Sequence, residues 1–469
     1  MSSMRRITLS PVLVFSIIAL FFGTLIIFLT PPFAGGDEEA HFVRAYGISR
    51  GQLVVERYGE LELPQSYRKT IGCIQTSTPI PGKIYTYDST GYGKDKTGAL
   101  SCALSLPLDR PNSEGVYTTA SSYSPTTYIP QVIAIWVGKL FNLPIVVMLY
   151  LMRIFVMIAY VAMIAFAIRL LPIRKWALAG VALLPYSILH FTNPGGDYML
   201  YGSISIFVAT IVKSLYLSPS QLRKKNKQLI FITLAAGVMM ILPKGLIPGV
   251  LFLPLIFFYG GRKQFVWQKI IVASIIAVVG LLWQKAVGGD VMEQPESASS
   301  SVFTLPLAFL KTMFYGWTSF DFFYNGSGGG GAAAVPSVIV TLVNMMIAMY
   351  LMVGYAKDTS MIKVNEIQRK LLGWVGILVA AGVVGASFAA IHIAASYLQS
   401  GDNIIKGVQI RYFYPALFML AMIPFARVFV TKESVFKKVV IIGSCISLAT
   451  TVFVTLLNYQ WGPFGGLFG

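Results

Sequence analysis

The sequence predicts an all-α polytopic membrane protein that forms one membrane domain, residues 1–469. Hydrophobic residues make up 55% of the chain and charged residues only 12%, with a mean hydropathy of +0.69. A soluble protein carries roughly twice that charged fraction. Apolar runs of about 20 residues, the length that crosses a bilayer as a helix, recur along the whole chain. These observations together predict about 11 transmembrane helices.

The net charge of +18 does not indicate a nucleic-acid-binding protein. Most of the basic clusters fall in short loops between apolar segments, which is the positive-inside pattern that sets membrane topology. This pattern places the N-terminus in the cytoplasm. The clusters are Arg5 with Arg6, Arg174 with Lys175, Arg223 with Lys224, Lys225 and Lys227, Arg262 with Lys263, Arg369 with Lys370, and Lys437 with Lys438.

The first apolar segment, Pro11–Thr30, is predicted to be a retained helix, because no small-residue cleavage site precedes its Thr-Pro-Pro end. Residues 31–124 then form a large first exterior loop, which is too long to be a simple connector. Residues 125–141 are apolar but short, and a span there would place Arg174 and Lys175 outside. We therefore expect an interfacial helix at 125–141.

The remaining spans follow from the same reasoning, with a second exterior segment at residues 286–333. Two of these spans flank Pro243 and are short, so the number of spans there is left open. The expected spans are Leu143–Leu171, Trp176–Phe191, Leu200–Leu217, Leu229–Leu242, Leu246–Tyr259, Ile270–Lys285, Val335–Tyr355, Leu371–Tyr397, Tyr412–Val430 and Val439–Leu457.

Two of the three cysteines, Cys73 and Cys102, lie in the first exterior loop, and Cys445 lies in a late span. An oxidising exterior would permit a Cys73–Cys102 disulfide. Two unpaired small residues are the alternative, and the sequence leaves both open.

Polar residues that are unusual for a membrane protein gather on the exterior side of this topology. Ionisable groups at membrane depth are costly, so they commonly face a cavity and work there. Carboxylates together with cations at one face indicate an anionic, lipid-linked substrate. The residues are Asp37, Glu38 and His41 after the first span, Arg153 in the second, Asn193 and Asp197 after the third, Lys244, and Arg411 with Tyr412.

Each of these residues also has a simpler interpretation. The acids Asp37–Glu39 could only start a helix, although Asp37, His41 and Arg44 share one helical face at i, i+4 and i+7. Asp197 could be a turn residue. Lys244 could extend its amine from a helix end to the interface, and Arg411 could be an interfacial anchor.

Two kinds of soluble site are excluded. The three histidines, His41, His190 and His392, are too far apart to form a zinc motif. The glycine run at residues 328–331 lacks the Lys-Ser/Thr of a phosphate-binding loop.

Three ordered segments resemble the motifs of a large bacterial family of multi-spanning membrane proteins of unknown function, allied to the GT-C glycosyltransferases. They are "PPFAGGDEEAHFVRAYGISRGQL", "YSPTTYIPQVIAIWVGKLF" and "GVQIRYFYPALFML", which begin at Pro31, Tyr123 and Gly407. "YLMRIF", from Tyr150, is similar to the start of the second span of the protein O-mannosyltransferases. The resemblance implies a GT-C plan with a carboxylate in the first exterior loop followed by interfacial helices.

The resemblance further implies a glycosyltransferase of the bacterial plasma membrane. It would move a sugar from a polyprenyl-phosphate donor to a cell-envelope glycopolymer, such as teichoic acid or a wall polysaccharide, by inverting displacement at the exterior face. In this scheme Asp37 is the catalytic base. Glu38, the second expected catalytic residue, and His41 orient the substrate or lie beside a metal. The candidates for binding the lipid phosphate are Arg153, Lys244 and Arg411.

Arg44, Asn193, Asp197 and Tyr412 complete the expected substrate-binding set. Asp197 departs from the family pattern, because Pro-Gly-Gly is inserted before it. No cofactor is required, and a divalent metal (Mg²⁺ or Mn²⁺) is compatible with the scheme. The alternative function is a transporter or flippase of lipid-linked sugars, but the repeated halves with broken helices that such a protein should show are not seen.

Overall fold

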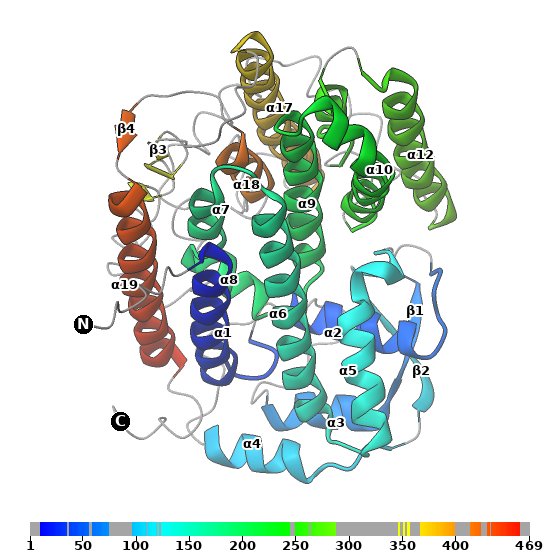
Figure 1. Cartoon of the computed structure of the whole chain (residues 1–469). Helices are drawn as coiled ribbons and strands as arrows, with labels where there is room; N and C mark the ends of the chain where they lie inside the picture. The colour runs from blue at the N-terminus through cyan, green and yellow to red at the C-terminus, as the bar shows by residue number, and fades with distance from the viewer. Residues whose placement is uncertain are drawn as a thin grey trace, which may run out of the picture.

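The computed structural model of this chain is a mostly helical membrane protein (Figure 1). It describes residues 10–34, 37–55, 59–74, 96–109, 111–118, 120–121, 123–243, 249–261, 264–287, 346–347, 350–351, 354–356, 366–398, 413–423, 429–431 and 433–459.

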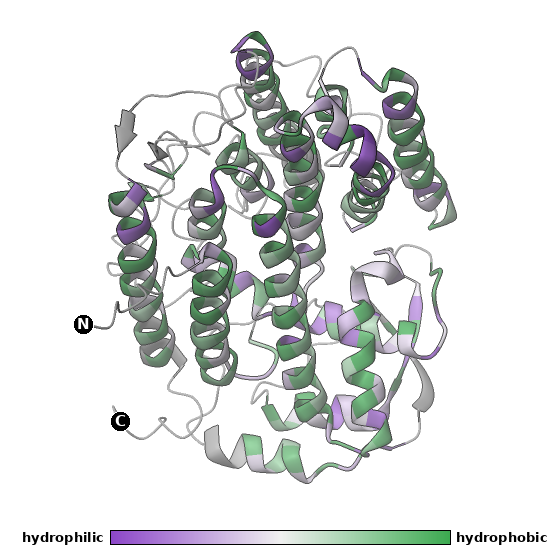
Figure 2. Ribbon diagram, in the orientation of Figure 1, coloured by the Kyte–Doolittle hydropathy of each residue, from purple (hydrophilic) through white to green (hydrophobic). Residues whose placement is uncertain are grey.

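Within these residues, six helices are long and apolar enough to contain a membrane span. Figure 2 shows that apolar residues dominate them, whereas hydrophilic residues concentrate near helix ends and in the part of the chain at the lower right of the view. The chain is therefore a multi-pass membrane protein. The six are α1 (Pro11–Leu29), α6 (Ile145–Leu170), α9 (Asp197–Leu215), α12 (Val266–Ala286), α17 (Glu366–Leu398) and α19 (Glu433–Tyr459).

One expected span, Trp176–Phe191, consists of two helices, α7 (Lys175–Ala182) and α8 (Pro185–Phe191). Pro185 has no N–H and cannot continue the hydrogen-bond ladder of α7. The backbone oxygens exposed by this break still find donors. Tyr160 Oη donates to the Ala182 oxygen at 2.9 Å, and Ser187 Oγ donates to the Val181 oxygen at 3.2 Å.

Prolines also interrupt two other expected spans. In the described part of Leu246–Tyr259 the chain forms the 3₁₀ helix η2 (Leu253–Phe258), with Pro254 in its first turn. The expected span Tyr412–Val430 contains the short helix α18 (Tyr414–Met422). It ends at Ile423, which is extended because Pro424 follows it.

The number of spans therefore remains a prediction. The helix α10 (Pro219–Ile241) covers the expected span at Leu229–Leu242 and begins with a capping box at Ser218. The greater part of the expected span Val335–Tyr355, and residues 288–333 of the second exterior segment, lie outside the described residues.

Most residues described between α1 and α6 form a compact unit, which we call the end module because it lies at one end of the helix bundle (Figure 1). Two short sheets occur that the all-α prediction did not include: β1 pairs antiparallel with β2 in the end module, and β3 (Gly354–Ala356) pairs in parallel with β4 (Phe429–Thr431). The end module contains α2 (Glu38–Ser49), β1 (Glu60–Pro64), α3 (Gln65–Ile74), α4 (Lys96–Ser105), β2 (Pro111–Tyr117), η1 (Pro125–Tyr128) and α5 (Ile129–Leu140).

A disulfide between Cys73 and Cys102 joins α3 to α4. The segment expected to lie in the interface, residues 125–141, contains η1 and α5. One side of α5 exposes Ile129, Ile133, Trp136 and Leu140, which recur at helical spacing. The opposite side is buried against the end module and α6.

Candidate functional site

The helix α2 begins at the turn that follows α1, and Asp37 is the residue before its first turn. Asp37 has a left-handed backbone conformation, with φ of 59°, which Asp tolerates better than most residues. Its side chain makes no capping hydrogen bond, so capping by this carboxylate does not explain its presence. Asp37 is exposed, whereas the next residue, Glu38, is buried.

Glu38 forms a two-point ion pair with Arg153 of α6. Arg153 Nε donates to Glu38 Oε1 at 2.6 Å, and an Nη2 hydrogen is donated to Oε2 at 2.8 Å. The side chains of Arg153 and Glu38 are 1% and 0% exposed. This pair connects the first turn of α2 to the N-terminal third of the membrane-spanning helix α6.

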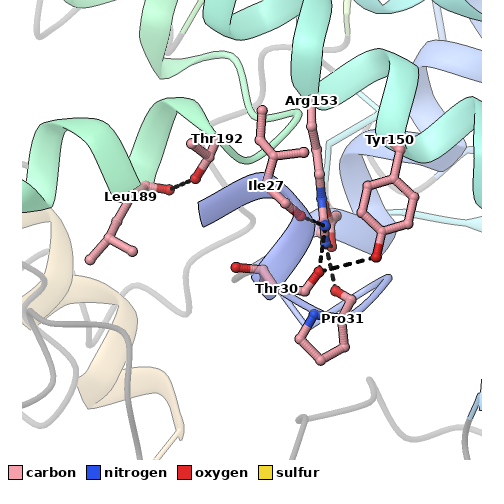
Figure 3. Close-up of polar contacts among 8 residues, drawn as sticks. Ile27, Thr30, Pro31, Tyr150, Arg153, Leu189 and Thr192 are labelled. Carbon is pink, nitrogen blue, oxygen red and sulfur yellow. Dashed lines mark hydrogen bonds and ion pairs between the residues drawn. The ribbon is translucent and has the colours of Figure 1, made fainter. Parts of the chain in front are cut away.

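The remaining donors of Arg153 bind backbone oxygens where α1 ends, as Figure 3 shows. Nη1 donates to Ile27 at 3.1 Å and to Thr30 at 2.7 Å, and Nη2 donates to Pro31 at 2.6 Å. A guanidinium has five N–H donors, and all five are used here. This geometry argues against phosphate binding by Arg153 and against a catalytic role for Glu38. Both residues hold α1, α2 and α6 together.

Arg44 is also occupied by protein groups. It is fully buried in α2 and donates to the backbone oxygens of Gln52, Leu53 and Tyr123 at 2.8–3.2 Å. Burial lowers the pKa of its guanidinium to about 10. Arg44 therefore stabilises the end module and does not fit substrate binding. The helical face expected to present Asp37, His41 and Arg44 together is not open, because only Asp37 on it is exposed.

His41 connects α2 to the loop between α8 and α9. Its Nδ1 lies 2.7 Å from Tyr128 Oη. On the other side of the ring, a Cβ added to Gly195 would lie 3.5 Å from Nε2, so the loop backbone passes close to the imidazole. Burial raises the pKa of Tyr128 well above its usual value, so this hydroxyl keeps its proton.

The same loop, residues 192–196, packs on η1 and α5. Gln131 Nε2 donates to the backbone oxygen of Pro194 at 2.9 Å, and Tyr198 Oη donates to that of Thr127 at 3.0 Å. A Cβ on Gly196 would lie only 2.4 Å from Thr127 Cγ2, so the contact depends on a glycine there. The two glycines of the Pro-Gly-Gly sequence thus allow the loop to approach the end module closely.

The loop also brings together His190, at the end of α8, and Asp197, at the start of α9. His190 Nε2 contacts Asp197 Oδ2. The side chain of Asp197 is 5% exposed and that of His190 is 15% exposed. The sequence prediction included Asp197 but missed His190. The sequence pattern that could have identified it is a histidine and an aspartate on either side of a Pro-Gly-Gly turn, which would bring the two side chains together.

Aromatic rings surround His190. Tyr186 stacks on its imidazole with ring centroids 5.7 Å apart and planes at 9°, and Tyr201 lies at 6.3 Å. Tyr414 of α18 packs against Tyr186 at 4.8 Å and against Tyr201 at 6.2 Å. The C-terminal motif "RYFYP" therefore reaches the same cluster through Tyr414, so α8, α9 and the loop between them contact all three motif-bearing segments.

Three predicted site residues, Lys244, Arg411 and Tyr412, lie outside the described residues. Asn193 is described and lies in the loop, partly exposed. Within the described chain, no group of three or more His, Cys, Asp or Glu residues could hold a metal ion. The candidate site thus comprises Asp37, His41, Tyr128, His190 and Asp197.

The fold and site define a polytopic helical membrane protein with a cluster of polar and aromatic residues where the end module meets the bundle. Residues 20–420 match the family described as "Predicted membrane protein (DUF2142)". The match covers well over half of the chain, which therefore belongs to that family. No curated protein and no solved structure shows significant similarity to it.

Proposed function

We propose that this protein is a GT-C-type glycosyltransferase. It transfers a sugar from a polyprenyl-phosphate donor to a cell-envelope glycopolymer, a teichoic acid or wall polysaccharide, at the exterior face of the bacterial plasma membrane. In this proposal the N-terminus is cytoplasmic and the end module is exterior.

The observation that carries the proposal is the convergence of the three motif-bearing segments on α8, α9 and the loop between them. His41 comes from the first segment, Thr127 from the second and Tyr414 from the third, and each contacts α8, α9 or the loop between them. An exposed carboxylate, Asp37, precedes His41 by one helical turn, and the backbone amide of His41 donates to the backbone carbonyl oxygen of Asp37 at 3.1 Å. Carboxylates and aromatic residues beside a bilayer suit a substrate that is part sugar and part lipid.

Asp37 is the candidate base because it is the exposed carboxylate of this group. In the proposed reaction Asp37 accepts the proton of the acceptor hydroxyl while that oxygen attacks the anomeric carbon. The bond from this carbon to the phosphate oxygen breaks, and its electron pair leaves with the lipid phosphate. A single displacement inverts the anomeric centre.

The test is transfer by purified protein in lipid nanodiscs, supplied with polyprenyl-phosphate sugars and an envelope glycopolymer. We expect the wild type to transfer label to the polymer and Asp37→Asn to reduce the rate by about 10²- to 10⁴-fold, the usual contribution of a general base. Glu62→Gln removes a surface carboxylate that pairs with Arg50, and it serves as the control. Its rate should match that of the wild type.

Two outcomes would contradict the proposal. Full activity of Asp37→Asn would remove Asp37 as the base. If the wild type transfers no sugar from any donor tested but moves labelled lipid-linked sugar across vesicle membranes, the protein is a transporter.

A further inference from the structure

The proposed reaction needs a group that stabilises the negative charge of the departing phosphate. Of the three cations expected to bind the lipid phosphate, Lys244 and Arg411 lie outside the described residues. Arg153 gives all five donors to protein oxygens, and Arg44, another expected substrate-binding residue, is buried with its donors on backbone carbonyls. Within the described chain, a different side chain with a spare donor can contribute to this role.

His190 has a spare ring nitrogen. Its Nε2 contacts Asp197 Oδ2, and its Nδ1 has no hydrogen-bond partner among the described residues. The side chain retains 15% exposure, about three times that of Asp197 behind it. A buried carboxylate therefore holds one side of the imidazole, and the other nitrogen remains available to a ligand.

The Asp197 carboxylate also determines what the free nitrogen can do. A carboxylate accepts the Nε2 hydrogen, so in the neutral ring Nδ1 bears a lone pair, and in the protonated ring Nδ1 becomes a donor. The protonated ring can then hydrogen-bond to the carboxylate on one side and to an anion on the other. The stacked Tyr186 ring holds the plane of the imidazole in both protonation states.

We propose that His190 binds the phosphate group of the lipid-linked substrate through Nδ1, with Asp197 as the residue that positions its ring. This inference rests on the proposed function and identifies the group that receives the departing phosphate. As the bond between the anomeric carbon and the phosphate oxygen breaks, the Nδ1 hydrogen bonds to a phosphate oxygen. The acceptor proton goes to Asp37, and no proton need leave His190.

Direct binding tests this proposal without relying on turnover. The probe is polyprenyl phosphate, titrated into full-length protein in nanodiscs of neutral lipid, with inorganic phosphate in a parallel series. We expect His190→Gln to weaken binding of polyprenyl phosphate by about 10- to 100-fold, the value of one hydrogen bond to a charged group. If inorganic phosphate shows the same loss, the site recognises the phosphate alone; loss with the lipid only means that the polyprenyl chain is needed for measurable binding.

A variant that keeps a positive charge separates ligand binding from a purely structural role. The groups around His190 are Asp197, Tyr186 and Tyr201, with Tyr414 packed on both tyrosines. His190→Lys keeps a donor and a positive charge but loses the stacked ring, and it should bind polyprenyl phosphate better than His190→Gln. Equal binding by these two variants would contradict a charge-assisted contact with the phosphate.

The control is Arg50→Gln, which removes a surface cation of the end module that pairs with Glu62, and it should bind as the wild type does. Thermal unfolding in detergent checks that each variant is folded. Equal binding by wild type and folded His190→Gln would overturn the proposal for His190 while leaving the proposed function intact. No binding of polyprenyl phosphate by the wild type would count against both.

Discussion

Two pairs of charged or titratable side chains, Glu38–Arg153 and His190–Asp197, lie in different parts of the same molecule. In the first, both side chains are almost fully buried and every guanidinium donor is bound to protein. In the second, the carboxylate is buried, but the imidazole keeps some exposure and has one nitrogen without a partner among the described residues. The comparison teaches that residue type does not separate a structural pair from a ligand-binding pair, whereas the occupancy of their hydrogen-bonding atoms does.

The largest effect is expected at Arg153. Arg153→Met leaves the Glu38 carboxylate buried without its cation, which costs about 3–5 kcal/mol in such sites. Chemical or thermal unfolding in detergent would measure this loss. The double variant Arg153→Met/Glu38→Leu removes the stranded charge and should recover part of the stability. If the single variant is as stable as the wild type, the pair does not hold the helices together.

Removing the disulfide tests how much the stability of the end module depends on interactions other than those of Arg153. Cys73 and Cys102 are separated by 29 residues, and a closed loop of that size contributes about 3–4 kcal/mol in the chain-entropy account. We expect Cys73→Ser/Cys102→Ser to lower the unfolding temperature while binding of polyprenyl phosphate persists. An unchanged unfolding temperature would show that the disulfide does not stabilise the part of the protein whose unfolding is measured.

At His190 the expected effect on stability is smaller and the effect on function larger. His190→Gln keeps an amide that can donate to Asp197, so we expect the free energy of unfolding to change by about 1 kcal/mol, the typical value of one hydrogen bond. Transfer of sugar should fall along with phosphate binding. If this variant unfolds as readily as Arg153→Met, the two pairs do not differ in the way proposed.

Lys139 of α5 is intermediate between the fully bonded Arg153 and the partly bonded His190. Its Nζ donates to Ser49 Oγ at 2.7 Å and lies 4.2 Å from the Tyr46 ring centroid, but the side chain is only partly buried. Burial, with the nearby Arg50 charge, lowers its pKa to about 8 from 10.5.

The lowered pKa of Lys139 is expected to have the smallest effect on stability, and the direction of that effect with pH is defined. Between pH 8 and 10.5 the unfolded chain binds more protons at Lys139 than the folded chain, so this residue's cost to stability decreases as pH rises through that window. The unfolding temperature of Lys139→Met should therefore rise less, or fall more, from pH 7.5 to pH 9.5 than that of the wild type. Parallel pH profiles of the two proteins would contradict the lowered pKa.

Much of the membrane architecture follows from local sequence. The helices α1 and α6 lie within a few residues of their predicted ranges, because their apolar runs contain no proline after the first turn. Two expected spans with an internal proline are less regular than predicted: Pro185 separates α7 from α8, and α18 ends before Pro424. The physical reason is that proline lacks an N–H and that the residue before it is disfavoured in the helical conformation. Averages of hydrophobicity along the chain contain neither effect.

By itself, the sequence determined that this is a polytopic helical membrane protein, and it marked the segments around Asp37, Asp197 and Tyr414 as unusual. Hydrophobicity and charge placement act locally along the chain, so both can be read from it. Only the tertiary structure decided that Glu38 and three backbone oxygens accept all the hydrogen bonds of Arg153, and that His190 has one nitrogen without a partner in the described part of the chain. Those outcomes depend on partners far away in the chain, and no local pattern encodes which donors remain available.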